Sequence, residues 1–446
     1  MPVKFNRPAR AVEDGDSGLP RLSGEPRRAH HGRHADHVLL PLLQRRPGLR
    51  QAALANLAFG ALGLFPALHS SLRLPRVLAL AWAATGAIAW AAAPPQFTVE
   101  ALPEYDALFR RESGWTGADV ASTVALSDEV TLWLYGDTWV GDVRDGKHVN
   151  ATMVNNSVGV QRGRDPAKAS VEFFYGRGRD GKPAALITPA DGRGYFWLQS
   201  GVRTANGLFL FAAQVERAGK GDDAFGFRHV ATWLLEVANP DDRPAAWRIA
   251  QHRLPAGRFS RDESITFGAA VLRHEGFVYI YGYRDRADPV FREKHAIVAR
   301  VREADLARFA QWAYYADGTW QAEWAKASRL FGHAASEYSV TWWPAARQFV
   351  AVYTRDSMFG SIELRRAQAP EGPWGEPAAV YTCPELKWDK RVFCYAAKAH
   401  PELSRSAEEL IVTYVANSTS FWHMAGDARL YWPVFLRLRP SAPSIP

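Results

Sequence analysis

A short β-rich run that ends in an aromatic residue recurs five times in the second part of this chain. The runs read LWLYG (132–136), LFLFA (208–212), VYIYG (278–282), FVAVY (349–353) and LIVTY (410–414). Their aligned aromatic positions, Tyr135, Phe211, Tyr281, Tyr353 and Tyr414, are 76, 70, 72 and 61 residues apart. This regular spacing predicts a repeated structural unit, and each unit is long enough to hold several strands.

Each run is predicted to be the second of four strands in its unit, because strand-like segments bounded by turn residues lie on both sides of it. First strands are predicted at 119–126, 196–202, 266–272, 338–344 and 393–399, and third strands at 155–161, 231–237, 296–301, 361–367 and 434–439. Outer strands are predicted at 171–176, 245–251, 312–318 and 376–382. The fifth unit has no outer strand after residue 440. The segment 96–102 is predicted to supply this strand and so to close a ring. The fold class is therefore predicted to be all-β: a five-bladed β-propeller of four-stranded antiparallel blades over residues 97–440, preceded by a leader outside the propeller.

The charge of the chain is concentrated before this repeat. Residues 1–96 hold 12 Lys and Arg against 5 Asp and Glu, whereas residues 97–446 hold 42 against 41. The repeat region is thus nearly neutral, which removes the electrostatic argument for a nucleic-acid partner.

The leader has two parts. Residues 1–50 show no helical or strand period and are predicted to be disordered, or to lie upstream of the true start codon. Residues 51–93 hold two apolar segments. The second has Arg73 and Arg76, an apolar core over 77–88 and the A-x-A sequence 89–91, the layout of a secretory signal peptide. We therefore expect an exported protein, periplasmic or extracellular; the alternative is a pair of membrane helices that anchor it.

The chain has two cysteines, Cys383 and Cys394, separated by ten residues. In an oxidising compartment, two thiols this close in sequence favour a disulfide over a metal site, which would need further ligands at recognisable spacing. We predict a bridge and no metal site.

Several segments of the repeat region resemble a known group of proteins. GWTGADVASTVAL, LWLYGDTWVG, MVNNSVGVQ and the late YTCPE, CYAAKAHPELS and LIVTYVANS segments are similar to secreted propellers catalogued as domains of unknown function, of a DUF4185-like kind. These are relatives of bacterial endo-D-arabinanases and, more distantly, of arabinanase and xylosidase propellers. The resemblance spans about residues 97–440 and implies the propeller fold and a furanoside-containing polysaccharide, D-arabinan in particular, as substrate class. A fold alone does not fix a function.

Propeller geometry predicts where a site would lie. The first strand of a blade lines the axis and the second strand returns antiparallel beside it. The start of the first strand and the end of the second strand therefore lie at the same rim of the central funnel, which we call the rim rule. Asp119 begins the first strand of blade one and Asp137 ends its second strand, so both carboxylates are predicted to face the central funnel. Glu337, at the start of blade four, is the third candidate for acid chemistry or for tuning a neighbour's pKa.

Further rim residues are candidates to bind a sugar through ring stacking and hydrogen bonds. They are Trp115, Trp139, Asn156, Trp197, Gln199, Glu263, Tyr283, Arg355, Tyr395 and Asn417. Structural roles remain open for several of them: Asp137 in an Asx-turn, Asp119 as a turn cap, Glu337 in a surface salt bridge, Arg355 paired with Asp356, Asn156 holding backbone, and the tryptophans in blade packing. His400 is predicted to be a structural histidine at the opposite rim.

Two acids and aromatic side chains at one funnel favour an exported glycoside hydrolase that uses carboxylate acid/base chemistry. The alternatives are a propeller that binds glycans without cleaving them and a membrane-tethered interaction platform. No nucleotide, dinucleotide or nucleophile-elbow motif occurs, so no cofactor is expected, while a structural calcium ion in the channel stays open. The expected partner is a carbohydrate polymer, with membrane contact only through an uncleaved leader, and the protein is expected to be a monomer.

Overall fold

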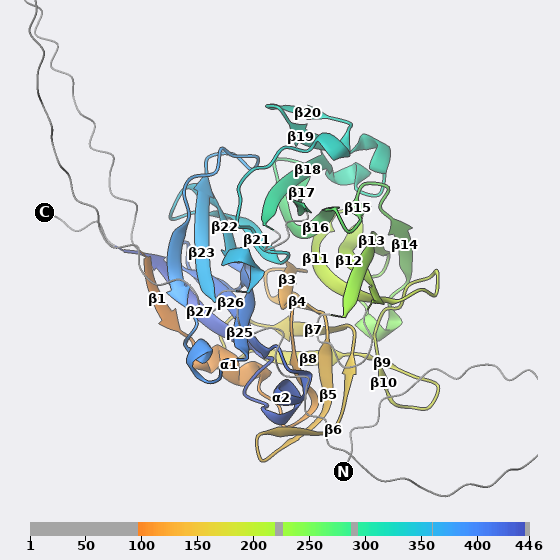
Figure 1. The fold of residues 1–446 in the computed structure, drawn as a ribbon, viewed down its shortest axis with the longest axis vertical. Coiled ribbons are helices and arrows are strands. Elements are labelled where there is room, and N and C mark those ends of the chain that lie inside the picture. Colours follow the sequence, from red (N-terminus) through yellow and green to blue (C-terminus); the bar gives the residue numbers. More distant parts are fainter. Residues whose placement is uncertain (1–96, 219–225, 287–292, 359, 442–446) are drawn as a thin grey trace, which may run out of the picture. The chain divides into compact units, whose positions relative to one another are not determined.

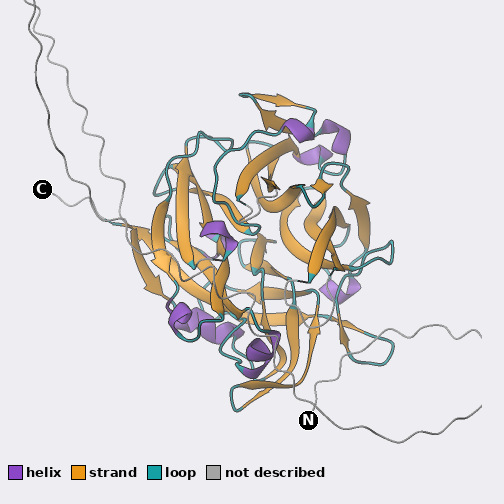
Figure 2. Cartoon of the chain, in the orientation of Figure 1, coloured by secondary structure: helices purple, strands orange, loops and turns teal. Residues whose placement is uncertain are grey.

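The computed structural model describes residues 97–218, 226–286, 293–358 and 360–441. These residues belong to one compact unit, and most of their regular secondary structure is β-strand (Figure 2). The α-helices in this part of the chain are α1 (Pro103–Phe109) and α2 (Phe421–Gly426). The predicted leader, apolar segments and signal peptide (1–50 and 51–93) lie outside the described residues. Among the residues that are described, no helix is long and apolar enough to span a bilayer.

Five sheets in the described part of the chain have four or more antiparallel strands, and each follows one unit of the sequence repeat (Figure 1). The first is β3 (Ser122–Ala125), β4 (Val130–Tyr135), β7 (Ser157–Arg162) and β8 (Ser170–Phe174). The second is β11 (Tyr195–Thr204), β12 (Gly207–Arg217), β13 (Phe227–Val237) and β14 (Ile249–Arg253). The third is β15 (Arg258–Phe259), β16 (Glu263–His274), β17 (Phe277–Arg286), β18 (Lys294–Arg302), β19 (Ala313–Ala316) and β20 (Thr319–Gln321). The fourth is β21 (Tyr338–Trp343), β22 (Gln348–Thr354), β23 (Ser361–Ala367) and β24 (Ala378–Thr382); the fifth is β25 (Val392–Ala399), β26 (Leu410–Ser418), β27 (Pro433–Pro440) and β1 (Phe97–Ala101).

Two details of this arrangement bear on the sequence predictions. The segment at 96–102 does supply the outer strand of the fifth sheet, because β1 pairs antiparallel with β27, with Phe97 opposite Pro440. The third sheet has six strands where four were predicted. Its extra members, β15 and β20, are two and three residues long, too short for a strand pattern to be visible in sequence.

Five strands match the predicted first strands: β3, β11, β16, β21 and β25. They lie next to one another in this order (Figure 1). Hydrogen bonds also join the last of them to the first. The imidazole Nδ1 of His400, which follows β25, is 2.6 Å from the hydroxyl of Thr123 in β3, and its Nε2 is 2.7 Å from the hydroxyl of Thr413. Burial, followed by the charge of Lys398, lowers the pKa of His400 to about 3, so the ring is neutral. His400 thus has the structural environment predicted for it.

The aromatic residues of the repeat fill the core. Tyr135, Phe211, Tyr281, Tyr353 and Tyr414 are all essentially inaccessible to solvent. They pack in apolar clusters, one of which joins Phe211 of the second sheet to Phe267 and Ile280 of the third. Burying a side chain of this size contributes about 2–3 kcal/mol, so every unit needs such a residue at this place. This requirement explains why the repeat is visible in the sequence.

The chain also forms two smaller sheets that the repeat does not contain. A three-stranded sheet joins β2 (Ser113–Ala118), β5 (Thr138–Arg144) and β6 (Lys147–Val154), and a two-stranded sheet joins β9 (Gly176–Arg177) and β10 (Pro183–Ala184). The strands β5 and β6 are inserted between the second and third strands of the first sheet. Helix α2 packs against β6 and β26. The three-stranded sheet and α2 therefore flank the end of the first and fifth sheets where the candidate acids lie.

Candidate active site

A cavity of about 710 Å³ lies where the first strands of the five sheets begin and the second strands end. Its lining includes all three acids predicted from the sequence, Asp119, Asp137 and Glu337. Asp119 comes from the turn between β2 and β3, Asp137 from the turn after β4, and Glu337 from the residue just before β21. The rim rule applied to the sequence therefore brought together residues that are more than 200 positions apart in the chain.

The carboxyl group of Asp119 is hydrogen-bonded through one oxygen. The hydroxyls of Tyr395 and Tyr431 donate to Oδ2 at 2.7 and 2.8 Å, whereas the buried Oδ1 has no hydrogen-bond partner among the described residues. Burial, then the charges of Glu337 and Asp137, raise the pKa of Asp119 well above its usual value, in spite of the two tyrosine hydrogen bonds. These effects favour the protonated form of Asp119, and Oδ1, which has no hydrogen-bond partner among the described residues, is the oxygen available to carry the proton.

Asp137 has a different environment. The indole Nε1 of Trp197 and the amide of Asn155 both donate to its Oδ1, at 2.8 and 3.1 Å. Burial raises the pKa of Asp137 to about 6, and these two hydrogen bonds and the charge of Arg217 limit the rise. Asp137 is therefore mostly ionised at neutral pH. The two carboxyl groups thus have different environments: neighbouring negative charges add to the effect of burial at Asp119, whereas hydrogen bonds and a positive charge limit it at Asp137.

The glycine before Asp137 makes room for this pair. A Cβ atom on Gly136 would lie 2.5 Å from Oδ1 of Asp119, closer than atoms can approach. Asp119 and the end of β4 are also joined through the backbone, because the amide of Asp119 donates to the carbonyl of Asp137 at 3.3 Å. The strand that reads LWLYG thus ends on glycine and aspartate because another carboxylate packs directly against it.

Glu337 is paired with a buried lysine. The ammonium group of Lys398, whose side chain is 3% exposed, donates to Oε2 of Glu337 at 2.9 Å. It also donates to the backbone carbonyls of Val120 at 2.6 Å and Ala396 at 3.4 Å. One cation from the fifth sheet is therefore bonded both to the acid from the fourth sheet and to the residue after Asp119.

The backbone around these groups is strained. Val120, Ala121, Ala396 and Tyr431 have φ angles of 65°, 47°, 58° and 71°, in the left-handed region that residues with a side chain rarely adopt. For the β-branched Val120 this conformation is especially unfavourable. Such strain costs of order 1–3 kcal/mol per residue and persists only where surrounding contacts impose it, most often at functional sites.

The walls of the cavity are rich in rings. On one side, Trp197 meets Phe227 edge-on with ring centroids 4.7 Å apart, beside His229 and Phe259. Burial, followed by the charge of Lys294, lowers the pKa of His229 to about 4, so this imidazole is neutral. On the other side are Phe393, Tyr395, Phe421 and Tyr431. Apolar ring faces beside hydroxyl, amide and carboxyl groups match the two surfaces of a sugar ring.

The ten predicted sugar-binding residues divide into two groups. Trp197, Gln199, Tyr283, Tyr395 and Asn417 line the cavity. Gln199 Oε1 is buried without a hydrogen-bond partner among the described residues, and the amide of Asn417 donates to the hydroxyl of Tyr395 at 3.2 Å. Asn417, Tyr395 and Asp119 thus form a hydrogen-bonded chain at the cavity wall.

The other five do not line the cavity, because each is held in packing or ion pairs. Trp115 stacks on Phe173 with centroids 4.1 Å apart, and Trp139 stacks on His148 at 4.8 Å. The side-chain amide of Asn156 is buried, donates to the carbonyls of Ile187 and Phe196 and accepts from the amide of Ile187. Glu263 pairs with Arg258, Arg284 and Arg286. Arg355 pairs with Glu363 and Asp356. Structural roles were left open in the sequence for Trp115, Trp139, Asn156 and Arg355, whereas the ion pairs of Glu263 were not foreseen.

Sequence reasoning missed Lys398 and Tyr431. Lys398 was placed inside the fifth unit's first strand without a role, although a lysine amid the apolar residues of FCYAAKA is unusual enough to have indicated a buried ion pair. Tyr431 belongs to the segment after α2, which lies outside the repeat pattern. Only the folded chain brings it against Asp119.

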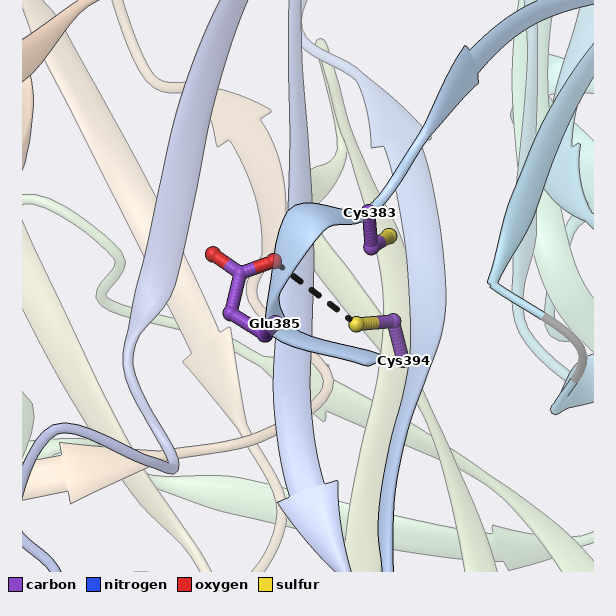
Figure 3. Close-up of side chains that lie close together, drawn as sticks. All are labelled: Cys383, Glu385 and Cys394. Carbon is purple, nitrogen blue, oxygen red and sulfur yellow. Dashed lines mark hydrogen bonds between the residues drawn. The ribbon is translucent and has the colours of Figure 1, made fainter. Parts of the chain in front are cut away.

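Cys383 and Cys394 lie away from this cavity, in the core between the fourth and fifth sheets (Figure 3). Both are free thiols in the structure, so the predicted disulfide is not formed here. The Sγ–H of Cys394 instead donates to Oε2 of Glu385 at 3.9 Å, and a hydrogen bond with Cys394, then burial, raise the pKa of Cys383. The two sulfurs and a Glu385 oxygen lie within 4.8 Å of one another. A structural zinc site needs four ligands, and the described residues offer three of the usual kinds at this place.

Comparisons with known proteins bear on the fold and the family. A solved Bacteroides ovatus protein with a provisional hydrolase assignment has a TM-score of 0.60 and 20% identity over 77% of this chain and 90% of its own. A thermostable family-43 glycoside hydrolase has a TM-score of 0.41 and 12% identity over 74% and 91% of the two chains. A Cellvibrio cellulosa alpha-L-arabinanase mutant has 0.38 and 9% over 72% and 91%.

The first of these structures shares the fold of this chain. No curated protein matches the sequence. A family profile described as a domain of unknown function, DUF5005, matches residues 103–440. The chain therefore belongs to the DUF5005 family, and this label replaces the DUF4185-like one expected from the sequence.

Proposed function

We propose that this protein is an exported glycoside hydrolase built on a five-bladed β-propeller. The five large sheets are its blades, β1 closes the ring through β27, and the cavity with Asp119, Asp137 and Glu337 is its active site. The substrate is a furanoside-containing polysaccharide, with D-arabinan favoured by the sequence resemblance. Export is supported by the signal-like segment at 73–91.

The observation that carries this proposal is that two carboxyl groups with different environments lie in one cavity. Burial and the charges of Glu337 and Asp137 raise the pKa of Asp119 well above its usual value, while Asp137 has a pKa of about 6 and is mostly ionised at neutral pH. Glycoside hydrolysis needs one carboxylic acid to protonate the leaving oxygen and one carboxylate to act as base or nucleophile. Asp119 takes the first role, and Asp137 takes the second.

Glu337 has the third role. Its negative charge is the largest cause after burial of the raised pKa of Asp119. Because Lys398 holds the Glu337 carboxylate at 2.9 Å, this charge has a fixed position relative to Asp119. Glu337 therefore keeps the proton on Asp119 until the substrate's leaving oxygen takes it.

The surroundings of the acids favour cleavage over binding alone. A propeller that only binds glycans has no need to keep carboxyl groups free of arginine partners. Among the described residues, no arginine forms an ion pair with Asp119, Asp137 or Glu337, while Glu263 and Glu363, outside the cavity, are both paired with arginine. Asp119 and Asp137 thus keep the freedom to exchange protons, while Glu337 is held by Lys398.

The test is a screen of the purified protein against soluble polysaccharides, including D-arabinan, arabinan, xylan, galactan and levan, with detection of new reducing ends. New reducing ends from D-arabinan are expected. Asp119→Asn and Asp137→Asn serve as matched inactive controls, since they preserve shape and remove the acid. Binding of a polysaccharide without any release of reducing ends would replace the proposal with the glycan-binding function.

A further inference from the structure

Exposed apolar side chains are concentrated near one opening of the molecule. Among the described residues, five large hydrophobic side chains are exposed: Phe227, Trp342, Met358, Trp388 and Trp422. Phe227 and Met358 line the cavity of the candidate active site. Trp422 follows the lining residue Phe421 directly, and Trp388 lies five residues before the lining residue Phe393. Exposed apolar side chains that lie together often mark a binding site, whereas single scattered ones do not.

Trp422 continues the wall of the cavity outward. It is 51% exposed and belongs to α2, whose first residue, Phe421, lines the cavity. The two rings meet edge-on, with centroids 5.5 Å apart and an angle of 84° between their planes. A ligand in contact with Phe421 therefore needs to extend by only one ring to reach Trp422.

Trp388 lies on the neighbouring segment. The amide of Thr419, just before α2, donates to the carbonyl of Arg391 at 2.9 Å, which holds the two segments together. The guanidinium of Arg429 covers one face of the Trp388 ring at 4.7 Å and is fixed in turn by Asp427. The ring is nonetheless 43% exposed. Its orientation is therefore set before any ligand binds, which lowers the entropy cost of stacking.

We propose that Trp388 and Trp422 form a binding surface for a polysaccharide chain that extends out of the cavity across the rim of the fifth sheet. This inference rests on the proposed function, since it takes the cavity as the place where one sugar residue of that chain is cleaved. The apolar face of a sugar ring stacks on an indole, and its hydroxyls need polar neighbours. Those neighbours are present beside Trp388, where Arg429 of the ion pair Asp427–Arg429 covers the ring and the ion pair Asp389–Arg391 follows it in the chain. The occupant is therefore a glycan chain of several residues.

The chain supplies a matched control. Trp342 at the end of β21 is 39% exposed and packs edge-on against Phe349, with centroids 5.0 Å apart, yet it does not line the cavity. Trp342→Ala removes a similar exposed indole, 39% exposed against 43% for Trp388 and 51% for Trp422. It should leave polysaccharide binding unchanged.

The experiment compares Trp388→Ala, Trp422→Ala, the double variant and Trp342→Ala in the full chain. Affinity electrophoresis in gels containing D-arabinan, xylan or levan measures polymer binding, and a 4-nitrophenyl arabinofuranoside measures turnover of a ligand too small to reach the rim. Each test substitution should weaken polymer binding by about threefold to tenfold, with a larger loss in the double variant. Turnover of the small glycoside should be unchanged. Trp→Phe variants at the two positions should retain part of the affinity, because a ring remains.

Three outcomes separate this inference from the proposed function. If the parent binds polymer and the test variants bind it equally well, or no more weakly than Trp342→Ala, the surface is not a glycan site. If the parent binds polymer through these tryptophans but releases no reducing ends, the surface stands and the hydrolase does not. If the parent binds none of the polymers while the alanine variants lose self-association or capture of a protein partner, the two rings serve a protein interface and the inference is overturned.

Discussion

The ammonium group of Lys398 lies 2.9 Å from Oε2 of Glu337 and 2.6 Å from the carbonyl oxygen of Val120, the residue that follows Asp119. A single buried cation thus connects two of the three candidate acids. Its hydrogen bond also holds the carbonyl of a valine with a φ angle of 65°, a strained conformation that persists only where surrounding contacts impose it. The geometry of the site therefore depends on a residue that has no acid/base role in the proposed reaction.

Replacing this cation should disturb both the site and the fold. Loss of one partner from a buried ion pair costs several kcal/mol, and because the Glu337 side chain is 21% exposed we expect Lys398→Met to lower the free energy of unfolding by about 1–3 kcal/mol. Turnover should fall by about tenfold to a hundredfold with little change in KM, since the aromatic walls remain intact. Thermal unfolding and steady-state kinetics measure the two effects.

A double-mutant cycle separates a positioning role from a general loss of structure. If Lys398 acts through Glu337, adding Lys398→Met to Glu337→Gln should cost much less activity than it does in the parent. Fully additive losses would show that Lys398 supports the fold without positioning Glu337.

The rate should depend on pH with the sign set by two carboxyl groups. The proposed reaction needs Asp137 ionised and Asp119 protonated. Activity should therefore rise through about pH 6, where Asp137 loses its proton, and fall at higher pH, where Asp119 loses its own. A profile of kcat/KM from pH 4 to 10 checks this. Activity that stays level from pH 4 to 8 would contradict the assignment of Asp137.

The repeat and the rim rule account for most of what was predictable. Tyr135, Tyr281 and their equivalents must be buried in every sheet, so their spacing reveals the number and order of the sheets. The predicted strand ends locate Asp119, Asp137 and Glu337, because the point where a strand begins or ends can be predicted from the local sequence. The partners of these acids depend on contacts between distant segments. Tyr431 comes from a segment after α2 that follows no periodic pattern.

The five candidates that do not line the cavity show the limit of the rim rule. Proximity to a strand end does not decide where a side chain points, and Trp115 and Trp139 belong to the inserted three-stranded sheet, which has no counterpart in the other units. Glu263 and Arg355 begin or follow predicted strands as expected, but partners of opposite charge within reach hold them in ion pairs.

Stability should show the cost of keeping Asp137 in the site. A carboxyl group whose pKa is raised from 3.8 to about 6 on folding binds more protons folded than unfolded between these values, so it destabilises the fold increasingly as pH rises from about 4 to 6. Asp137→Asn should therefore unfold at a higher temperature than the parent at pH 7.5, by up to about 2–3 kcal/mol in free energy of unfolding. Below pH 4 this advantage should vanish. A variant less stable than the parent at both pH values would show that Asp137 is a structural turn residue.

The two core thiols should oxidise if the protein is exported. A disulfide between Cys383 and Cys394 would close a loop of ten intervening residues and stabilise the fold by roughly 2–3 kcal/mol if it is unstrained. The Glu385 carboxylate beside Cys394 can accept the thiol proton during oxidation. Intact mass and alkylation of the denatured, non-reduced protein measure the bond. Two alkylated cysteines in material collected from the oxidising compartment would show that the thiols stay reduced.

Asp119→Asn and Asp137→Asn should each abolish hydrolysis while leaving the fold intact. An amide of nearly the same shape can neither transfer the proton nor carry the charge that an oxocarbenium-like transition state requires, and loss of acid/base catalysis costs about a hundredfold to ten-thousandfold in rate. Tyr395 and Trp197 can still hydrogen-bond the amide oxygen, so cooperative unfolding and polymer binding should persist. Glu263→Gln is the matched control, because this acid lies outside the cavity and is paired with Arg284. Near-parental turnover in either asparagine variant would make that residue a turn-former, and loss of activity together with the melting transition would make it structural.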